Sequence, residues 1–269
     1  MMAPTVSGLF CYPIKSCKGI SLERTPVSLR GILYDREWAI VDAKTGKVLT
    51  QREDPRLCLI ETAFKGATLE FSVPGQGGMD VPLEVTDEPA NRRKVVTVWS
   101  DRAVGFEQGM WASGWISAFL HRHCYLVRMA RDHVRASEGG TRIAFADGHE
   151  FLVISEASLS DLNGRLDAAL PMDRFRPNIV VAGCPPYAED GWTAFTIGGG
   201  VRLLGADPCV RCPITTTDQV TAERGKEPLK TLATYRKAPK GVVFGRNFNG
   251  LNGGSIAIGD SVDVLTAPY

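Results

Sequence analysis

The sequence predicts a mainly β protein with some α structure. A mixed β/α N-terminal domain over residues 1–125 is expected to pack on a C-terminal β-barrel domain over residues 126–269. Many short runs of β-branched and aromatic residues are bounded by glycine, proline or charged residues, as strands are. Few segments have apolar residues at helical spacing. A charged, weakly apolar stretch at residues 131–140 separates two sets of strands, so we expect the domain joint within residues 125–140.

The strands expected in the first half are short and follow one another through tight turns. They cover residues 6–11, 33–42, 57–64, 68–73, 95–99 and 124–129. Glycines within residues 42–47 and 74–78 can supply the positive φ that turns require.

Three segments predict helices. Residues 108–121 place Trp111, Trp115 and Phe119 at helical spacing. Residues 155–170 repeat leucine on one face and begin at Ser155, a favourable N-cap residue. Residues 228–235 form a shorter candidate that opens with proline, which a first helical turn tolerates.

Further strands are expected in the second half, at residues 151–154, 178–182, 193–197, 201–204, 212–217 and 262–266. The glycine-rich residues 197–201 and 249–254 do not spell a dinucleotide-binding G-x-G-x-x-G, so we interpret them as hairpin turns. Many short strands with few helices are typical of a barrel-type module.

Charge and cysteine content exclude several classes of protein. The 31 basic and 30 acidic side chains leave a net charge of +1, so no global field attracts nucleic acid or an anionic membrane. The seven cysteines are odd in number and scattered, which fits reduced thiols better than a disulfide framework. We find no signal peptide and no apolar run of about 18 residues. We therefore expect a cytoplasmic protein, and we interpret the charged run at residues 51–56 as a solvated loop.

The most informative motif is the pair Cys209 and Cys212, followed by a β-branched run. Thiolates are soft ligands for transition metals, and the guanidinium of Arg211 would favour the thiolate form. No second Cys-x-x-Cys and no later histidine exist to complete a zinc site. The strand expected after Cys212 disfavours a redox dithiol, which usually opens a helix. A buried structural pair and a single working thiolate remain open.

Three polar clusters upstream could bind an anion or a heterocycle. Lys15 and Ser16 lie in a basic turn after the first strand, which could also be a solvated turn. Arg36 lies in a charged triplet inside an apolar strand, either at an exposed edge or aimed at a ligand. Arg176 and Asn178 enter a buried-looking strand, where they suit a phosphate or a heterocycle edge. The alternative there is an ion pair that holds the strand end.

Taken in order, the motifs are much more specific than each is alone. The series YPIKSCKG, DREW, LTQREDPRL, FLVISEASLSDLN, FRPNIVVAG, YAEDGW and CVRCPITTTD spans almost the whole chain. It resembles the MOSC family, and within it the proteins in which an MOSC N-terminal β-barrel domain precedes an MOSC domain. That group includes the mitochondrial amidoxime-reducing components and their bacterial counterparts.

The resemblance implies a sulfite-oxidase-type molybdenum centre carried on molybdopterin. Cys212 corresponds to the thiolate that binds the metal, and Cys209 to the motif cysteine that is not a ligand. His149 stands where relatives often have a hydroxyl side chain; it and Asp147 are candidates for catalytic proton transfer. The cofactor-binding positions correspond to Lys15, Ser16, Arg36, Asp147, Arg176 and Asn178.

The implied reaction is the reduction of amidoximes, hydroxylamines and N-hydroxylated bases to the amidine or amine. The chain has no cysteines with iron–sulfur spacing. We therefore expect the electrons to come from a separate protein of the cytochrome b5, ferredoxin or flavodoxin type. Two other functions stay open: a carrier of molybdenum cofactor or sulfur without turnover, and a cofactor-free interaction module.

Overall fold

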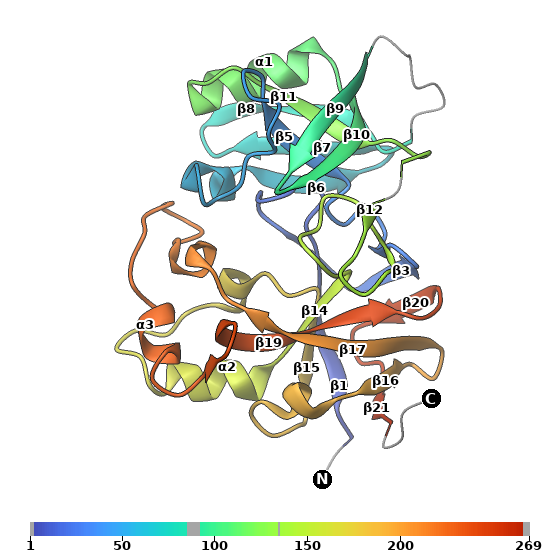
Figure 1. The fold of residues 1–269 in the computed structure, drawn as a ribbon, viewed down its shortest axis with the longest axis vertical. Coiled ribbons are helices and arrows are strands. Elements are labelled where there is room, and N and C mark those ends of the chain that lie inside the picture. The colour runs from blue at the N-terminus through green and yellow to red at the C-terminus, as the bar shows by residue number, and fades with distance from the viewer. Residues whose placement is uncertain (1–2, 85–91, 134, 266–269) are drawn as a thin grey trace.

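The computed structural model describes residues 3–84, 92–133 and 135–265. Strands dominate these residues and helices are few, which confirms the predicted mainly β class. Figure 1 shows two lobes, one with helix α1 (Met110–Leu120) and the other with α2 (Glu156–Asn163) and α3 (Leu229–Leu232). We call these the upper and the lower lobe, as they stand in Figure 1.

The lower lobe is built on one large sheet with the strand order β2-β1-β15-β14-β19-β17-β16-β21, and β18 pairs with β19 at its side. The Val262 amide donates to the Pro4 carbonyl at 2.8 Å, and Thr5 bridges Ser261, so the sheet closes on itself beside β1. Its strands are β1 (Thr5–Cys11), β2 (Ile20–Leu22), β14 (Phe151–Ser155), β15 (Ile179–Ala182), β16 (Ala194–Ile197), β17 (Val201–Val210), β18 (Lys237–Ala238), β19 (Gly241–Gly250) and β21 (Val262–Val264).

Two apolar clusters hold the lower lobe together. Leu9, Phe195 and Phe248 are fully buried in the cluster that joins strands around the closed sheet. Phe175 and Phe244 belong to a second cluster, which lies between the sheet and α2 and α3. Burying apolar side chains on both faces of one sheet is the main favourable contribution to such a fold.

The upper lobe packs a four-stranded sheet, β5-β11-β10-β9, and a three-stranded sheet, β6-β7-β8, around a shared core with α1. Trp38, Phe71 and Ile116 meet in this core and are almost completely buried. The strands are β5 (Trp38–Asp42), β6 (Glu61–Lys65), β7 (Thr68–Val73), β8 (Gln76–Pro82), β9 (Arg93–Val98), β10 (Asp101–Glu107) and β11 (Cys124–Met129).

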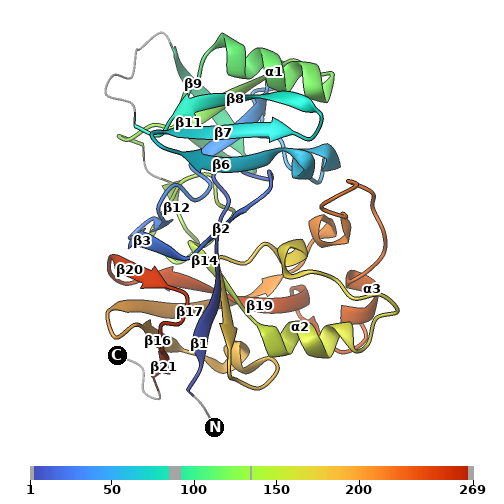
Figure 2. The ribbon, with the colours of Figure 1, turned by 180° about the vertical axis from the view of Figure 1, so that it is seen from behind.

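The first strands of the chain belong to the lower lobe. β1 pairs with β15, and β3 (Arg24–Ser28) lies between β4 (Gly31–Ile32) and β20 (Gly254–Ala257). Figure 2 shows β1 running through the lower lobe beside the strands of the second half. A short pair, β12 (Arg135–Ala136) with β13 (Arg142–Ile143), follows the upper lobe. The domains predicted at residues 1–125 and 126–269 stay a prediction.

All three predicted helices form, but each is shorter than predicted. Ser155 caps α2 as expected, since its hydroxyl accepts a hydrogen bond from the Ser158 amide at 3.0 Å. α2 ends at Asn163, followed by Gly164, and not at residue 170. Pro228 stands directly before α3. Among the described residues, no helix has the length and apolar character needed to cross a membrane.

Four strand predictions were wrong in whole or in part. Residues 33–37 are not strand, because Tyr34 and Arg36 take the left-handed φ values of +66° and +48°. Residues 55–59 form a 3₁₀ helix before β6. The run after Cys212 is also a 3₁₀ helix, Pro213–Thr216, because proline opens it and the Thr215 amide bonds back to the Cys212 carbonyl at 3.1 Å. The expected strand at 262–266 ends at Val264, and residues 266–269 lie outside the described part.

The turn after β5 carries a buried carboxylate with a lowered pKa. Asp42 is 4% exposed and accepts hydrogen bonds from the Thr45 amide at 2.7 Å and from Arg122. Burial would raise the pKa of Asp42, but the hydrogen bonds from Thr45 and Arg122 lower it to about 2. This stabilisation is present above the unfolded pKa of 3.8 and is lost as the pH falls towards 2.

We expect Asp42→Asn to lower the free energy of unfolding by about 2 kcal/mol at neutral pH. The difference should shrink as the pH falls through about 4 to 2, because the wild-type carboxylate becomes protonated. Urea unfolding at several pH values measures this. The control is Asp132→Asn, whose exposed partner is Arg93 at 3.0 Å and whose effect should stay below about 1 kcal/mol. A difference for Asp42→Asn that does not change with pH would contradict the assignment.

Candidate functional site

A cavity of about 460 Å³ lies between the two lobes. Its walls come from the turn after β1, the loop after β5, residues 138–152, the start of β15 and the end of β17. The cavity brings together every site residue predicted from the sequence: Lys15, Ser16, Arg36, Asp147, Arg176, Asn178 and Cys212. Segments far apart in the sequence thus form one site.

Lys15 and Ser16 are held on a tight turn directly after β1. The Lys15 amide donates to the Trp38 carbonyl at 2.8 Å, and the Gln51 side chain donates to the Ser16 carbonyl at 2.7 Å. Ser16 has a φ of +69°, which residues other than glycine rarely adopt. Lys15 and Ser16 are only 5% and 6% exposed, so the alternative of a solvated basic turn is wrong.

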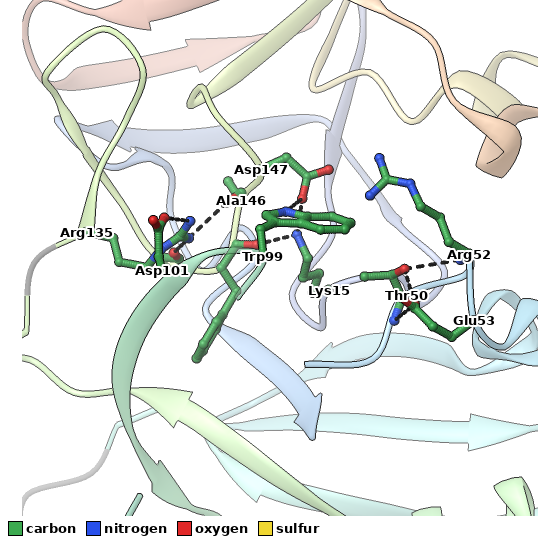
Figure 3. Close-up of polar contacts among 11 residues, drawn as sticks. Lys15, Thr50, Arg52, Glu53, Trp99, Asp101, Arg135, Ala146 and Asp147 are labelled. Carbon is green, nitrogen blue, oxygen red and sulfur yellow. Dashed lines mark hydrogen bonds and ion pairs between the residues drawn. The ribbon is translucent and has the colours of Figure 1, made fainter. Parts of the chain in front are cut away.

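The Lys15 ammonium donates to the Phe145 carbonyl at 2.7 Å and forms an ion pair with Asp147 Oδ1. Trp99 Nε1 donates to the same carboxylate oxygen at 3.0 Å, as Figure 3 shows. Partial desolvation within the cavity would raise the pKa of Asp147, but the charge of Lys15 and the hydrogen bonds from Lys15 and Trp99 hold it well below its ordinary value. Burial also lowers the pKa of Lys15, against the pull of Asp147. Asp147 is therefore ionised at neutral pH and accepts hydrogen bonds.

Arg36 and Arg176 both lie over the ring of Tyr12, with their guanidinium carbons 4.4 and 4.1 Å from its centroid. Arg36 forms an ion pair with Asp35 and donates to Asn178 Oδ1 at 3.0 Å. Burial lowers the pKa of Arg176, and no carboxylate in the described part of the chain pairs with it. A partly desolvated cation of this kind is costly unless an anion joins it.

Cys209 and Cys212 both line the cavity and both are free, but their surroundings differ. Arg211 Nη1 donates to Cys209 Sγ at 2.9 Å, so this guanidinium contacts the cysteine that we did not assign to the metal. The Cys212 sulfur receives no hydrogen bond from any described residue. Nor do the described residues include a group of three or more His, Cys, Asp or Glu placed to hold a metal ion. This arrangement does not match a zinc half-site, in which both sulfurs would bind the same metal ion.

The lining carries more positive than negative side chains. Six lysines and arginines line the cavity against three carboxylates, an excess of three positive charges. Arg52, Arg176 and Arg211 form no ion pair with a carboxylate within residues 3–84, 92–133 and 135–265; they contact the Trp99 ring, the Cys17 carbonyl and the Phe175 carbonyl. This excess of positive charge favours an anionic ligand.

His149 also lines the cavity, with Nδ1 2.9 Å from Asn249 Oδ1. Its Nε2 is buried and has no hydrogen-bond partner among the described residues, although Glu138 Oε2 lies 3.7 Å away. A hydrogen bond from a ligand would satisfy this nitrogen.

The sequence-based site missed two residues. Arg52 belongs to the run interpreted as a solvated loop, which is wrong: Gln51 is fully buried and Arg52 lines the cavity. Arg52 lies 4.2 Å from the centroid of the Trp99 ring. The available signal was Trp99 itself, a large aromatic residue at the end of the predicted strand 95–99, directly before Ser100 and Asp101, which are residue types common in turns.

Family models match the chain in two segments. Residues 3–123 match the MOSC N-terminal beta barrel domain, and residues 140–263 match the MOSC domain. Together these segments cover most of the chain.

Curated relatives agree with this. Mitochondrial amidoxime-reducing component 1 of Mus musculus is 36% identical over 97% of this chain and 82% of that protein. The Homo sapiens protein of the same name is 36% identical over 97% of this chain and 83% of its own length. Molybdenum cofactor sulfurase of Danio rerio is 31% identical over 90% of this chain, which spans 31% of that longer protein. The resemblance expected from the motifs is confirmed: the chain belongs to the MOSC family, with an MOSC N-terminal beta barrel domain followed by an MOSC domain.

Proposed function

We propose that the protein is a molybdenum-cofactor-dependent oxidoreductase that reduces N-hydroxylated compounds with electrons from a separate donor protein. One observation carries the proposal: the unengaged thiol of Cys212 lines a cavity that also holds three arginines without a carboxylate partner among the described residues. The similarity to proteins named amidoxime-reducing components supports the choice of substrate class.

The residues present fit a pterin-carried molybdenum. A thiolate is a soft ligand suited to this metal, and Cys212 would supply it. Arg36, Arg176 and Lys15 would neutralise the phosphate, with bonds that are stronger because they are charge-assisted. Asn178 and Ser16 would contact the polar edge of the pterin, and the Nε2 of His149, which makes no hydrogen bond to a described residue, is a further donor or acceptor for it. The sulfite-oxidase type of centre, with one protein thiolate, matches the single unengaged sulfur.

Reduction of an amidoxime breaks its N–O bond and converts C=N–OH into C=NH. The oxygen leaves as water, and the reaction consumes two electrons and two protons. The cofactor, when bound, supplies the redox step that amino-acid side chains cannot perform. The side chains of the cavity bind and orient the cofactor and the substrate, and they set the charge of the site.

Asp147 acts as a hydrogen-bond acceptor in this proposal and not as the proton donor. Its Oδ1 is occupied by Lys15 and Trp99, while the side chain as a whole is 57% exposed towards solvent. Oδ2 can therefore accept a hydrogen bond from the amino group of an amidoxime. Because the pKa of Asp147 lies well below its ordinary value, the carboxylate keeps its charge across the physiological range.

The electron donor would be a cytochrome b5-type, ferredoxin-type or flavodoxin-type protein. The seven cysteines form no disulfide in the described residues, which supports a reducing, cytoplasmic location.

A second candidate function is transfer of sulfur or cofactor without turnover. The 31% identity to molybdenum cofactor sulfurase over 90% of this chain favours it. Mass spectrometry separates the two functions, since a carrier would show a persulfide on a cysteine of the cavity and a reductase would show bound pterin.

We expect Cys212→Ala to reduce the molybdenum content of the purified protein to about a tenth or less, because the metal loses its protein ligand. Elemental analysis after expression in a molybdenum-replete host measures this, and reduction of benzamidoxime should fall with it. Cys209→Ser is the matched control and should keep the metal. Equal molybdenum in Cys212→Ala and wild type would refute the ligand assignment.

We expect Arg176→Gln to lower the pterin content by about tenfold, because a charge-assisted hydrogen bond is worth ~1.5–3 kcal/mol. Pterin fluorescence after oxidation gives the content. The fold should survive, since no carboxylate among the described residues loses a partner. Arg165→Gln is the control, an exposed residue paired with Asp161 at 2.9 Å. Unchanged pterin in Arg176→Gln would show that the cavity cations do not hold the cofactor.

A further inference from the structure

Trp99 adopts an unusual conformation at the tip of the β9–β10 hairpin. Val98 pairs with Asp101, so Trp99 and Ser100 form a two-residue turn. The first position of such a turn needs a positive φ and usually holds glycine, asparagine or aspartate. Trp99 has a φ of +56° there. A bulky residue in this conformation is disfavoured, and such outliers cluster where a site uses them.

The surroundings hold the indole in a fixed orientation. Its Nε1 donates to Asp147 at 3.0 Å, and the Arg52 guanidinium lies 4.2 Å from the ring centroid. The Lys15 ammonium lies 5.8 Å from the same centroid. Figure 3 shows these three side chains around Trp99, each from a different segment. One hydrogen bond and two cations over the ring thus fix its orientation, although it stands on a hairpin tip.

The ring stands beside the main cavity, whose lining includes its partners but not Trp99 itself. Trp99 lines a second cavity of about 270 Å³, which shares Lys15 and Thr50 with the main cavity. Arg52 and Asp147 line the main cavity. Trp99 nevertheless remains 45% exposed. A tryptophan that only filled space between the lobes would be expected to bury nearly all of its surface.

We propose that Trp99, with Arg52, is a specificity-determining residue whose ring stacks against the planar aromatic part of the substrate at the mouth of the main cavity. Aromatic faces and guanidinium planes bind planar π systems without requiring a particular substituent. The ligand class is therefore N-hydroxylated compounds with an aromatic ring or heterocycle next to the N–O group. This inference rests on the proposed reductase function.

The test compares two substrates that share the reacting group. Benzamidoxime carries a ring on the amidoxime carbon, and acetamidoxime carries a methyl group there. In the cofactor-loaded protein, Trp99→Asn removes the ring but suits the left-handed turn. We expect the ratio of kcat/KM for benzamidoxime to that for acetamidoxime to fall about tenfold, since stacking of one ring changes binding by about five- to 150-fold. In Trp99→Phe, which keeps an aromatic ring, this ratio should fall much less.

The ratio cancels any general effect of losing the hydrogen bond to Asp147, because both substrates share it. Trp111→Asn is the matched control, since Trp111 is 75% exposed on α1 and lines neither cavity. An unchanged ratio, or an equal loss for both substrates, would overturn the proposal and leave Trp99 as a contact between lobes.

Calorimetric binding of both compounds keeps this test separate from the proposed function. If neither compound is reduced, but benzamidoxime binds about tenfold more weakly to Trp99→Asn than to wild type, the stacking site stands and the reductase function fails. If both are reduced and the variant binds both compounds as the wild type does, the stacking site fails and the reductase function stands.

Discussion

The position of β1 inside the large sheet is the constraint on which the site depends. β1 pairs with β15 along one side, and its first residues meet the segment before β21 on the other. The Phe10 amide donates to the Asn178 carbonyl at 2.9 Å, so the register of this pair fixes the turn after β1 against the start of β15. A register slip of one residue would move every side chain of the strand to the opposite face of the sheet. The pairing of β1 with β15 therefore also determines which side chains reach the cavity.

The cavity concentrates features that do not favour stability. Ser16, Arg36 and Arg176 line it with left-handed backbones, each of which costs about 1–2 kcal/mol. The excess of positive side chains adds repulsion when no ligand is bound. Hydrogen bonds to backbone carbonyls and the ring of Tyr12 offset part of this cost. Strain and uncompensated charge at one place, within an otherwise apolar and well-paired fold, are expected of a ligand site.

Strands with local signals were predictable from the sequence, and residues governed by tertiary contacts were not. Residues 68–73 and 124–129 match β7 and β11 because β-branched and aromatic residues there coincide with burial. The run after Cys212 misled because the Thr215 and Thr216 hydroxyls bond back to carbonyls three residues earlier, at 3.0 and 2.8 Å. Such bonds compete with strand pairing. The long strand β19 was missed because its glycines and polar residues give no alternation.

The same distinction between local signals and tertiary contacts applies to the site residues. No spacing in the sequence could bring Lys15 next to Asp147, and only the order of the motifs along the chain pointed to both. Arg52 looked like part of a solvated charge run because its stacking partner comes from a hairpin almost fifty positions away. Its role became visible only in three dimensions.

Because β1 belongs to the sheet formed by the second half of the chain, the two family segments do not form independent structural units. The two family segments meet near residues 123–140, yet a piece that began there would lack β1 and leave β15 with an unpaired edge. It would also lack Lys15, Ser16 and Arg36, half of the six positions that accompany Cys212 in the predicted site. If either segment were exchanged between two relatives, the resulting cavity would therefore combine one half of its lining from each protein. Residues 12–16 and 175–178 are therefore parts of one structural unit that spans the chain.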